Sequence, residues 1–377
     1  MATVSTVVPV TSRIVLFGAT GYSGGLTARA LVERGQAPML AGRNPDKLAH
    51  LADQLGGLEF AVADVHRPET VQALVERGDV LISTVGPFTR WGGAALEAAV
   101  AKGAHYLDST GEPPFIREVF ERWGPPARSS GCALMTAMAY DYVPGNLAAA
   151  LALRDAGPAA TRVEIGYFVT GRATRSAMSG GTLASLAGVL FEPGFARRGG
   201  VIVSERAGLR QRSFTVGEVT RAGVSLGASE HYALPQSYPG LVDVDVYLGW
   251  FGPKSKAISV LSRTGGVVVA LPVVKTVTSG VLKRLFPGSS GGPDQEDRDK
   301  SATLVVAETF DAQRRALARA VVQGPNPYDF TGKMLAWAAE RIVNVGVRGV
   351  GSLGPVAAFG LDELATGAEQ AGLRRAE

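Results

Sequence analysis

The sequence has a single cysteine and few histidines, and this scarcity excludes several kinds of site. Its 377 residues contain one cysteine, Cys132, so the chain can form neither an internal disulfide nor a cysteine-based zinc or iron–sulfur site. The four histidines, His50, His66, His105 and His231, stand far apart, without the spacing of paired metal ligands. We therefore expect no bound metal.

Charge of one sign and long apolar runs are also lacking. The chain has 38 basic and 34 acidic residues, largely interspersed, so its net charge of +4 gives no basic stripe for nucleic acid. The first residues, Met1–Thr11, have no basic start that would indicate a signal peptide. The apolar run Gly265–Val274 falls far short of the roughly 20 residues of a membrane-spanning helix. We expect a cytoplasmic protein without nucleic-acid partners or transmembrane segments.

The length and the apolar fraction of 46% predict two domains with ample cores. Residues 1–150 alternate short apolar runs with helical segments, which predicts a doubly wound parallel-sheet Rossmann domain of the α/β class. Residues 151–350 predict an α+β substrate or dimerisation domain with a largely antiparallel sheet, and a homodimer is one hypothesis for it. Residues 351–377 predict a C-terminal helix, over 356–373, that packs back on the first domain.

Individual elements follow from the same patterns. The first domain should contain the strands Ile14–Phe17, Met39–Ala41, Phe60–Ala63, Val80–Thr84, His105–Leu107 and Ala133–Thr136. Its predicted helices are Gly24–Glu33, Asp46–Leu55, Pro68–Glu76 and Ala94–Lys102, each followed by a glycine. The second domain should contain the strands Arg162–Thr170, Phe214–Val219, Val242–Trp250 and Leu304–Thr309, and a solvated loop over Phe286–Lys300.

A glycine-rich turn directly follows the first predicted strand. Gly18, Gly21 and Gly24 stand between this strand and a helix, as in turns that bind the diphosphate of a dinucleotide. The second strand ends in Ala-Gly-Arg-Asn, where a protein specific for NAD would usually carry an acidic residue. Arg43 and Lys47 instead suit the 2′-phosphate of NADP(H). The residues expected to bind this cofactor are Gly18, Thr20, Gly21, Tyr22, Ser23, Gly24, Arg43, Asn44, Lys47, Asp64, Val85, Gly86 and Pro87.

Candidate chemical groups follow the later strands, because ligands of such sheets bind beyond the strands' carboxyl ends. Reduction of a polarised double bond needs a hydride and a proton, and a tyrosine hydroxyl can supply the proton. Tyr142 is the first candidate donor, Tyr140 is a potential partner and His231 is the second candidate donor, although core packing is the alternative for each. Asp141 is expected to bond to backbone at the turn or to cap the next helix. Arg90, Trp91 and Glu112 are candidate substrate residues.

Several motifs together resemble the saccharopine dehydrogenase-like NADP-binding family. They are Gly18–Gly24, Ala41–Asn44, Gly86–Gly92, His105–Glu112 and Tyr140–Pro144, and in the second half Ser179–Ser185, Ser229–Tyr232 and Gly324–Thr331. The second-half motifs resemble the branch of actinobacterial trans-acting enoyl reductases. The resemblance implies a Rossmann fold, NADP(H) and reduction of a conjugated C=C bond.

Three hypotheses of function stay open at this point. The first is an NADPH-dependent oxidoreductase that reduces a C=C bond of an apolar acyl or polyketide-like small molecule. The second is an imine reductase acting on an amino compound, and the third is a non-catalytic NADP-binding or lipid-associated protein. The apolar segment 257–286 could line a channel for a lipidic substrate, rest on a membrane surface or be buried in a helix pair or dimer contact. No tyrosine precedes a lysine by four residues, so the short-chain dehydrogenase mechanism is excluded.

Overall fold

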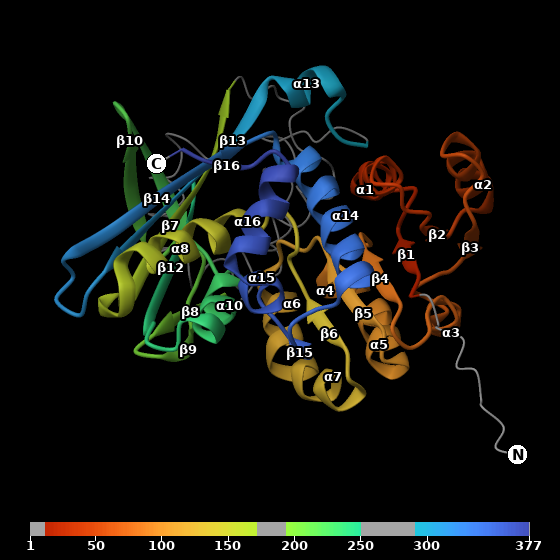
Figure 1. The fold of residues 1–377 in the computed structure, drawn as a ribbon, viewed down its shortest axis with the longest axis horizontal. Helices are drawn as coiled ribbons and strands as arrows, with labels where there is room; N and C mark the ends of the chain where they lie inside the picture. Colours follow the sequence, from red (N-terminus) through yellow and green to blue (C-terminus); the bar gives the residue numbers. More distant parts are fainter. Residues whose placement is uncertain (1–11, 172–193, 250–290, 377) are drawn as a thin grey trace, which may run out of the picture.

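The computed structural model describes residues 12–171, 194–249 and 291–376, and these form two sheets with helices around them. Figure 1 shows the first sheet on one side of the molecule and the second sheet on the other, with helices between them. The segment 257–286 and the motif Ser179–Ser185 lie outside the described residues. None of the helices in the described ranges combines the length and the apolarity needed to cross a membrane.

The first sheet has seven strands, and each neighbouring pair is parallel. Its order is β15 (Gly351–Ser352), β6 (Ala133–Met135), β5 (His105–Asp108), β4 (Val80–Ser83), β1 (Ile14–Phe17), β2 (Met39–Gly42) and β3 (Phe60–Val62). The six strands predicted from the sequence are confirmed to within one residue at each end. Because β1 lies between β2 and β4, the chain order reverses there, and a crevice opens beyond the carboxyl ends of these strands.

Helices cover both faces of this sheet. On one face lie α1 (Tyr22–Glu33) and α14 (Pro327–Val345), and on the other α3 (Pro68–Gln72), α5 (Gly93–Lys102), α6 (Pro113–Glu118) and α7 (Gly124–Ser130). The remaining helices of this part are α2 (Pro45–Gln54), α4 (Phe88–Trp91), a π-helical turn at Val119–Trp123 and α8 (Val143–Ala156). The helix predicted over Pro68–Glu76 ends at Gln72, and Leu74 and Val75 are buried in the turn that follows it.

The second sheet has nine strands and is mostly antiparallel, with one parallel pair, β7 and β12. Its main order is β10 (Gln211–Val216), β11 (Val219–Ser225), β12 (Asp243–Leu248), β7 (Arg162–Gly171), β13 (Ser301–Phe310), β14 (Ala316–Gly324) and β16 (Arg374–Arg375). Beside this row lie β8 (Phe195–Arg198), β9 (Val201–Ser204), the helix α10 (Glu230–Ser237) and the 3-10 turn Gly157–Ala159.

Two predictions for the second half are wrong in detail. The expected strand Phe214–Val219 is the end of a hairpin, because Val216 pairs with Val219 and Gly217 turns the chain with φ of 57°. The expected loop Phe286–Lys300 contains a short helix, α13 (Gln295–Asp299), capped by the Asp294 carboxylate, which accepts from the Asp297 amide. An acidic cap in a charged run starts a helix even where solvent surrounds it.

The C-terminal residues contact both halves of the molecule. The single helix predicted over 356–373 is two helices, α15 (Pro355–Phe359) and α16 (Leu361–Gln370), because Gly360 has a left-handed φ of 82°. Before them β15 pairs with β6 of the first sheet, and after them β16 pairs with β14 of the second. Between these strands, α16 packs against α8 and α14.

Candidate functional site

The turn after β1 has no room for side chains at two of its glycines. Gly18 has φ of 92°, and a Cβ atom there would lie 2.6 Å from Oγ1 of Thr84. At Gly24 it would lie 2.1 Å from the carbonyl oxygen of Gly18, so α1 packs directly on the turn. Gly21 precedes α1 and gives it no side-chain cap. The first amides of α1 are therefore available to an anion.

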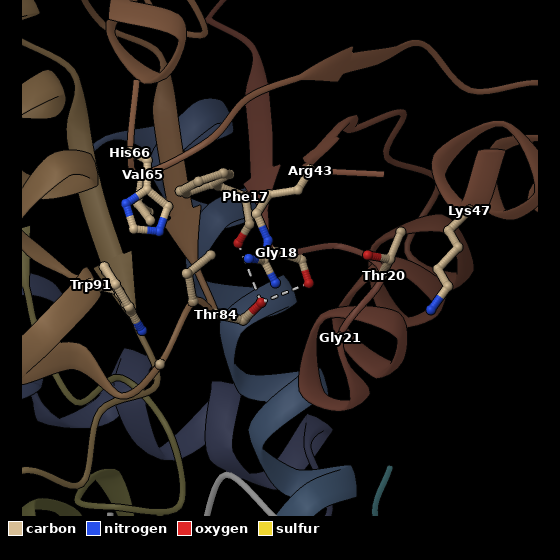
Figure 2. Close-up of a pocket in the computed structure, with 13 residues that line it drawn as sticks. Phe17, Gly18, Thr20, Gly21, Arg43, Lys47, Val65, His66, Thr84 and Trp91 are labelled. Carbon is tan, nitrogen blue, oxygen red and sulfur yellow. Dashed lines mark hydrogen bonds between the residues drawn. The ribbon is translucent and has the colours of Figure 1, made fainter. Parts of the chain in front are cut away.

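A cleft of about 380 Å³ lies in front of this turn, at the carboxyl ends of β1, β2, β3 and β4 (Figure 2). Its walls are Phe17, Gly18, Thr20, Gly21, Gly42, Arg43, Lys47, Val65, His66, Thr84, Val85, Gly86 and Trp91. Seven of the thirteen residues predicted to bind the cofactor are in this set. Trp91, predicted for the substrate, also lines this cleft.

The cleft is cationic on the side of β2. Arg43 and Lys47 line it, and no aspartate or glutamate is among the described residues of its walls. Asn44 holds this part of the chain in place, because its side chain accepts a 2.9 Å hydrogen bond from the Lys47 amide and caps α2. The Asp64 carboxylate accepts from the His66 amide at 2.9 Å, which fixes the loop after β3.

The opposite wall is aromatic. The rings of His66 and Trp91 meet edge to face with centroids 4.8 Å apart. The guanidinium of Arg90 lies 4.4 Å from the Trp91 ring centroid. Sequence reasoning did not single out His66 for this wall, because it follows a short, half-exposed strand and belongs to no motif. Pro87 lies just before α4, next to this wall.

Tyr22, at the start of α1, connects the glycine turn to the second half of the chain. Its hydroxyl donates to the carbonyl of Pro293 and accepts from Nη1 of Arg298 at 3.0 Å. Nε of Arg298 in turn lies 2.8 Å from Oδ1 of Asp329, and the Tyr328 ring packs edge-on against Tyr22 at 5.1 Å. The side chain of Arg298 therefore connects the short helix α13 to α1 and to the start of α14.

Ser23 and Gly24 lie in the first turn of α1. Among the contacts of the described residues, neither contacts Arg298 or Pro293, the partners of Tyr22. The carbonyl of Ser23 accepts from the Thr27 hydroxyl within the helix, at 2.9 Å. Neither residue is in the walls of the cleft.

Side-chain hydrogen bonds join the loops that follow β4, β5 and β6. The Glu112 carboxylate accepts from the amides of Phe88 and Thr89, at 2.8 and 2.9 Å. Oδ1 of Asp108 accepts from the Ala137 amide at 2.8 Å. Glu112 therefore holds the loop after β4, and the substrate role predicted for it stays a prediction.

Both candidate tyrosines are buried. Tyr142 is 3% exposed and donates a 3.2 Å hydrogen bond to the carbonyl of Gly111, and burial raises its pKa well above the ordinary value. Tyr140 is 2% exposed, and its ring meets that of Tyr167 edge to face at 5.8 Å. These contacts serve packing between the loops, and the catalytic roles of both tyrosines remain predictions.

His231 is also buried, on α10 of the second half. Nδ1 lies 2.9 Å from the carbonyl of Ala228, and the ring packs against Phe195. Burial lowers the pKa of His231 to about 4, so the imidazole is neutral at pH 7. A neutral imidazole is a weak proton donor, and His231 is not in the walls of the cleft.

Sequence reasoning missed a buried pair beside Tyr142. The hydroxyl of Tyr167, on β7, lies 2.7 Å from Oε1 of Glu230, on α10, and accepts from the Gly145 amide at 2.7 Å. The Tyr167 hydroxyl caps α8 by accepting from this amide. The N-cap residue of α8, Tyr142, provides no side-chain bond. Burial raises the pKa of Glu230 to about 8. Since the three elements are remote in sequence, no local pattern could predict the pair.

Asp141 differs from its expected role. It neither bonds to backbone nor caps α8, and no hydrogen bond reaches its carboxyl from the residues that the structure describes. Burial raises the pKa of this carboxyl to about 7. Oδ2 lies against the loop after β5, 2.8 Å from where a Cβ atom of Gly111 would stand.

Comparisons with known proteins agree with this geometry. Residues 14–158 match the family Saccharopine dehydrogenase NADP binding domain. A Mycobacterium tuberculosis protein with the provisional name trans-acting enoyl reductase is 29% identical over 400 residues, with 92% of this chain and 93% of the relative aligned. A trans-acting enoyl reductase of Mycobacterium ulcerans is 37% identical over 140 residues, which are 36% of this chain and 34% of that protein.

A solved structure shows the same fold. It is apo saccharopine dehydrogenase (L-Glu forming) from Saccharomyces cerevisiae, with a TM-score of 0.59 over 97% of this chain and 100% of that chain. Its sequence identity is 11%, so this likeness concerns the fold alone.

Proposed function

We propose that the protein uses NADPH to reduce a conjugated C=C bond of an apolar acyl or polyketide-like substrate, since residues 14–158 match the family Saccharopine dehydrogenase NADP binding domain. The observation that carries this proposal is the cleft in front of the glycine turn, with Arg43 and Lys47 in its wall. The relative aligned over 93% of its length supports the reaction type, because its name is trans-acting enoyl reductase.

The walls of the cleft fit this cofactor. The amides that open α1 would bind its diphosphate, and the guanidinium of Arg43 would bind the 2′-phosphate together with Lys47. Val85 and Gly86 would let the ribose pass close to backbone, and Trp91, which lines the same cleft, would pack on the cofactor. When bound, the reduced nicotinamide supplies a hydride ion.

The proposal assigns a separate role to each of three parts of the chain. Residues 1–150 hold the cofactor, residues 151–350 enclose the substrate and provide a contact for a second copy, and residues 351–377 join the two. The position of the nine-stranded sheet beside the first domain, with helices between the two sheets, supports this assignment (Figure 1).

The C=N alternative needs a cationic group free to hold the carboxylate of an amino compound. In the described loops after β4, β5 and β6, the cationic candidate is Arg90, and its guanidinium lies over Trp91. This arrangement favours the C=C reaction.

Cofactor choice is tested by titrating NADPH and NADH while following nicotinamide fluorescence. Arg43→Ala should weaken NADPH binding about 10- to 100-fold and leave NADH binding nearly unchanged, because a charge-assisted contact to phosphate contributes about 1.5–3 kcal/mol. Arg29→Ala is the matched control, since Arg29 is an exposed arginine on α1. Equal affinity of the parent for both nucleotides would contradict the assignment.

The reaction is tested by following NADPH absorbance with two kinds of acceptor. One is octenoyl pantetheine thioester, and the other is a mixture of a 2-oxo acid with an amino acid, which forms an imine. We expect oxidation of NADPH with the thioester alone. Oxidation with the mixture alone would establish the imine reaction, and binding of NADPH without turnover of either acceptor would indicate a non-catalytic protein.

A further inference from the structure

We propose that the carboxyl group of Asp141 donates the proton in this reduction, in place of the tyrosine hydroxyl beside it. The inference rests on the proposed function and deepens it, because it assigns the second half of the chemistry to a named atom. The supporting observation is the position of Asp141 between the loops after β5 and β6, where its carboxyl lies against Gly111.

The position of Asp141 suits a reacting group. The cleft with Arg43 and Lys47 covers the ends of β1, β2, β3 and β4, and its part around β2 is where the adenosine half of a dinucleotide binds. The second half of a dinucleotide extends past the switch point between β1 and β4, over β4, β5 and β6. Asp141 follows β6, so it lies at the end of the sheet where the nicotinamide and the substrate meet.

The neighbouring hydroxyl groups are already engaged. The proton of Tyr142 is donated to the Gly111 carbonyl, and the hydroxyl of Tyr167 is shared between Glu230 and the Gly145 amide. Among the hydrogen bonds of the described residues, none involves the Asp141 carboxyl, whereas the hydroxyls of Tyr142 and Tyr167 both take part in one. A proton donor needs this freedom, because the bond it makes should form in the transition state.

The surroundings also keep the carboxyl protonated. Burial raises the pKa of Asp141 to about 7. The titratable groups whose charges interact with it are Tyr142 and Glu230, and their own pKa values are raised. Each of them is therefore neutral at pH 7, and among the described neighbours no cation stabilises the ionised form of Asp141.

The step balances in atoms and electrons. A hydride ion adds to one carbon of the double bond with its electron pair, and the electron pair of the double bond moves to the other carbon. That carbon takes the proton of Asp141 and forms the second C–H bond. The substrate is reduced by two electrons, the nicotinamide is oxidised, and the Asp141 carboxylate recovers its proton from water.

Titration of Asp141 tests the inference independently of turnover. Aspartate labelled with ¹³C at the side-chain carboxyl gives an NMR signal for each aspartate, and Asp141→Asn identifies the signal by its loss. We expect this carboxyl to titrate near pH 7 in the full chain with NADPH bound. Titration below about pH 5 would overturn the proposal, because the group would then be ionised at neutral pH.

Kinetics provide the second readout, with octenoyl pantetheine thioester as the probe. We expect kcat/KM of the parent to fall about tenfold per pH unit above pH 7, and Asp141→Asn to lose about 100-fold or more at pH 6 while its NADPH affinity stays unchanged. Asp155→Asn is the matched control, because Asp155 lies at the far end of α8, paired with Arg375. A variant Asp141→Asn with the rate and pH profile of the parent would overturn the proposal, although the enoyl reductase function would stand.

The outcomes separate the two proposals. A parent that binds NADPH and reduces no acceptor contradicts the proposed function, and the NMR titration still decides whether Asp141 is protonated. If Asp141→Asn fails to fold, the signals of the other aspartates are assigned by their own variants, beginning with Asp155→Asn. The signal left unassigned is that of Asp141, and its titration in the parent decides the question.

Discussion

Gly145 is a position at which a single methyl group would disturb three elements. A Cβ atom there would lie 2.1 Å from the hydroxyl oxygen of Tyr167 and 2.3 Å from Oε1 of Glu230. The missing side chain lets β7 and α10 reach the start of α8, and the Gly145 amide then donates to Tyr167. The cap of α8 depends on this contact, since Tyr142 gives it none.

Gly145→Ala should therefore lower the free energy of unfolding by about 2–4 kcal/mol, from overpacking together with loss of the cap. Urea unfolding followed by circular dichroism measures the difference. Gly93→Ala is the control, because a Cβ atom at this first residue of α5 would meet no atom within 4 Å. We expect the control to change stability by less than about 1 kcal/mol. Equal stability of both variants would contradict the role of Gly145.

At the scale of elements, the contact between α13 and α1 joins the glycine turn to the second half. Arg298 is the central residue, since it donates to the Tyr22 hydroxyl and pairs with Asp329 at the start of α14. The side chains of Arg298 and Asp329 are only 13% and 23% exposed, so solvent screens their ion pair less than a surface pair. This ion pair should contribute more to the free energy of unfolding than an exposed pair does.

A double-mutant cycle measures this contribution. Arg298→Ala and Asp329→Asn should each lower the free energy of unfolding by about 1–2 kcal/mol, and the double variant should lose about 1 kcal/mol less than the sum. Arg117 and Glu121 provide a comparison, because they form a more exposed pair within one turn of helix. Their coupling should be about 0.5 kcal/mol or less. Additive losses for Arg298 and Asp329 would show that the pair is not coupled.

The strands of the first sheet could be predicted from the sequence because their information is local. Each is a short apolar run between helices, and glycines such as Gly103, with a left-handed φ of 71°, end the helices. The hairpin at Gly217 differs from the predicted single strand, because its turn has only two residues, Gly217 and Glu218, between the β-branched Val216 and Val219. The glycine turn and Arg43 could be predicted for the same local reason.

The remaining features of the site depend on contacts between distant segments. Glu230 lies 63 positions from Tyr167 in the sequence, yet their side chains share a hydrogen bond. Aspartates in turns usually bond to nearby backbone, whereas none of the described residues gives the Asp141 carboxyl a hydrogen bond. No residue pattern distinguishes these two environments.

At the scale of the whole molecule, two acids with raised pKa values make stability depend on pH. Burial raises the pKa of Glu230 from 4.5 to about 8 and that of Asp141 from 3.8 to about 7. At pH values between the ordinary and the raised pKa of each group, the folded chain binds more protons than the unfolded chain. The free energy of unfolding therefore falls as the pH rises. His231 acts in the opposite direction, but only between about 4 and 6.5, because its pKa is lowered.

Between about pH 6.5 and 8.5 the protein should therefore lose about 2 kcal/mol of unfolding free energy, and Glu230→Gln should lose less than half of that. Chemical unfolding at several pH values measures both slopes. Glu363→Gln is the control, since Glu363 is half exposed and pairs with Arg341 at the surface. A parent whose stability is constant or rises over this range would contradict the protonated state of Glu230.

The two short strands near the C-terminus determine when the molecule can be completed during synthesis. The first sheet lacks a strand until the ribosome has released residue 352, and the second until it has released residue 375, because β15 extends one sheet and β16 the other. The earlier residues can collapse around the glycine turn while translation continues. The final fit between the two halves can therefore be acquired only once both of these late strands are available.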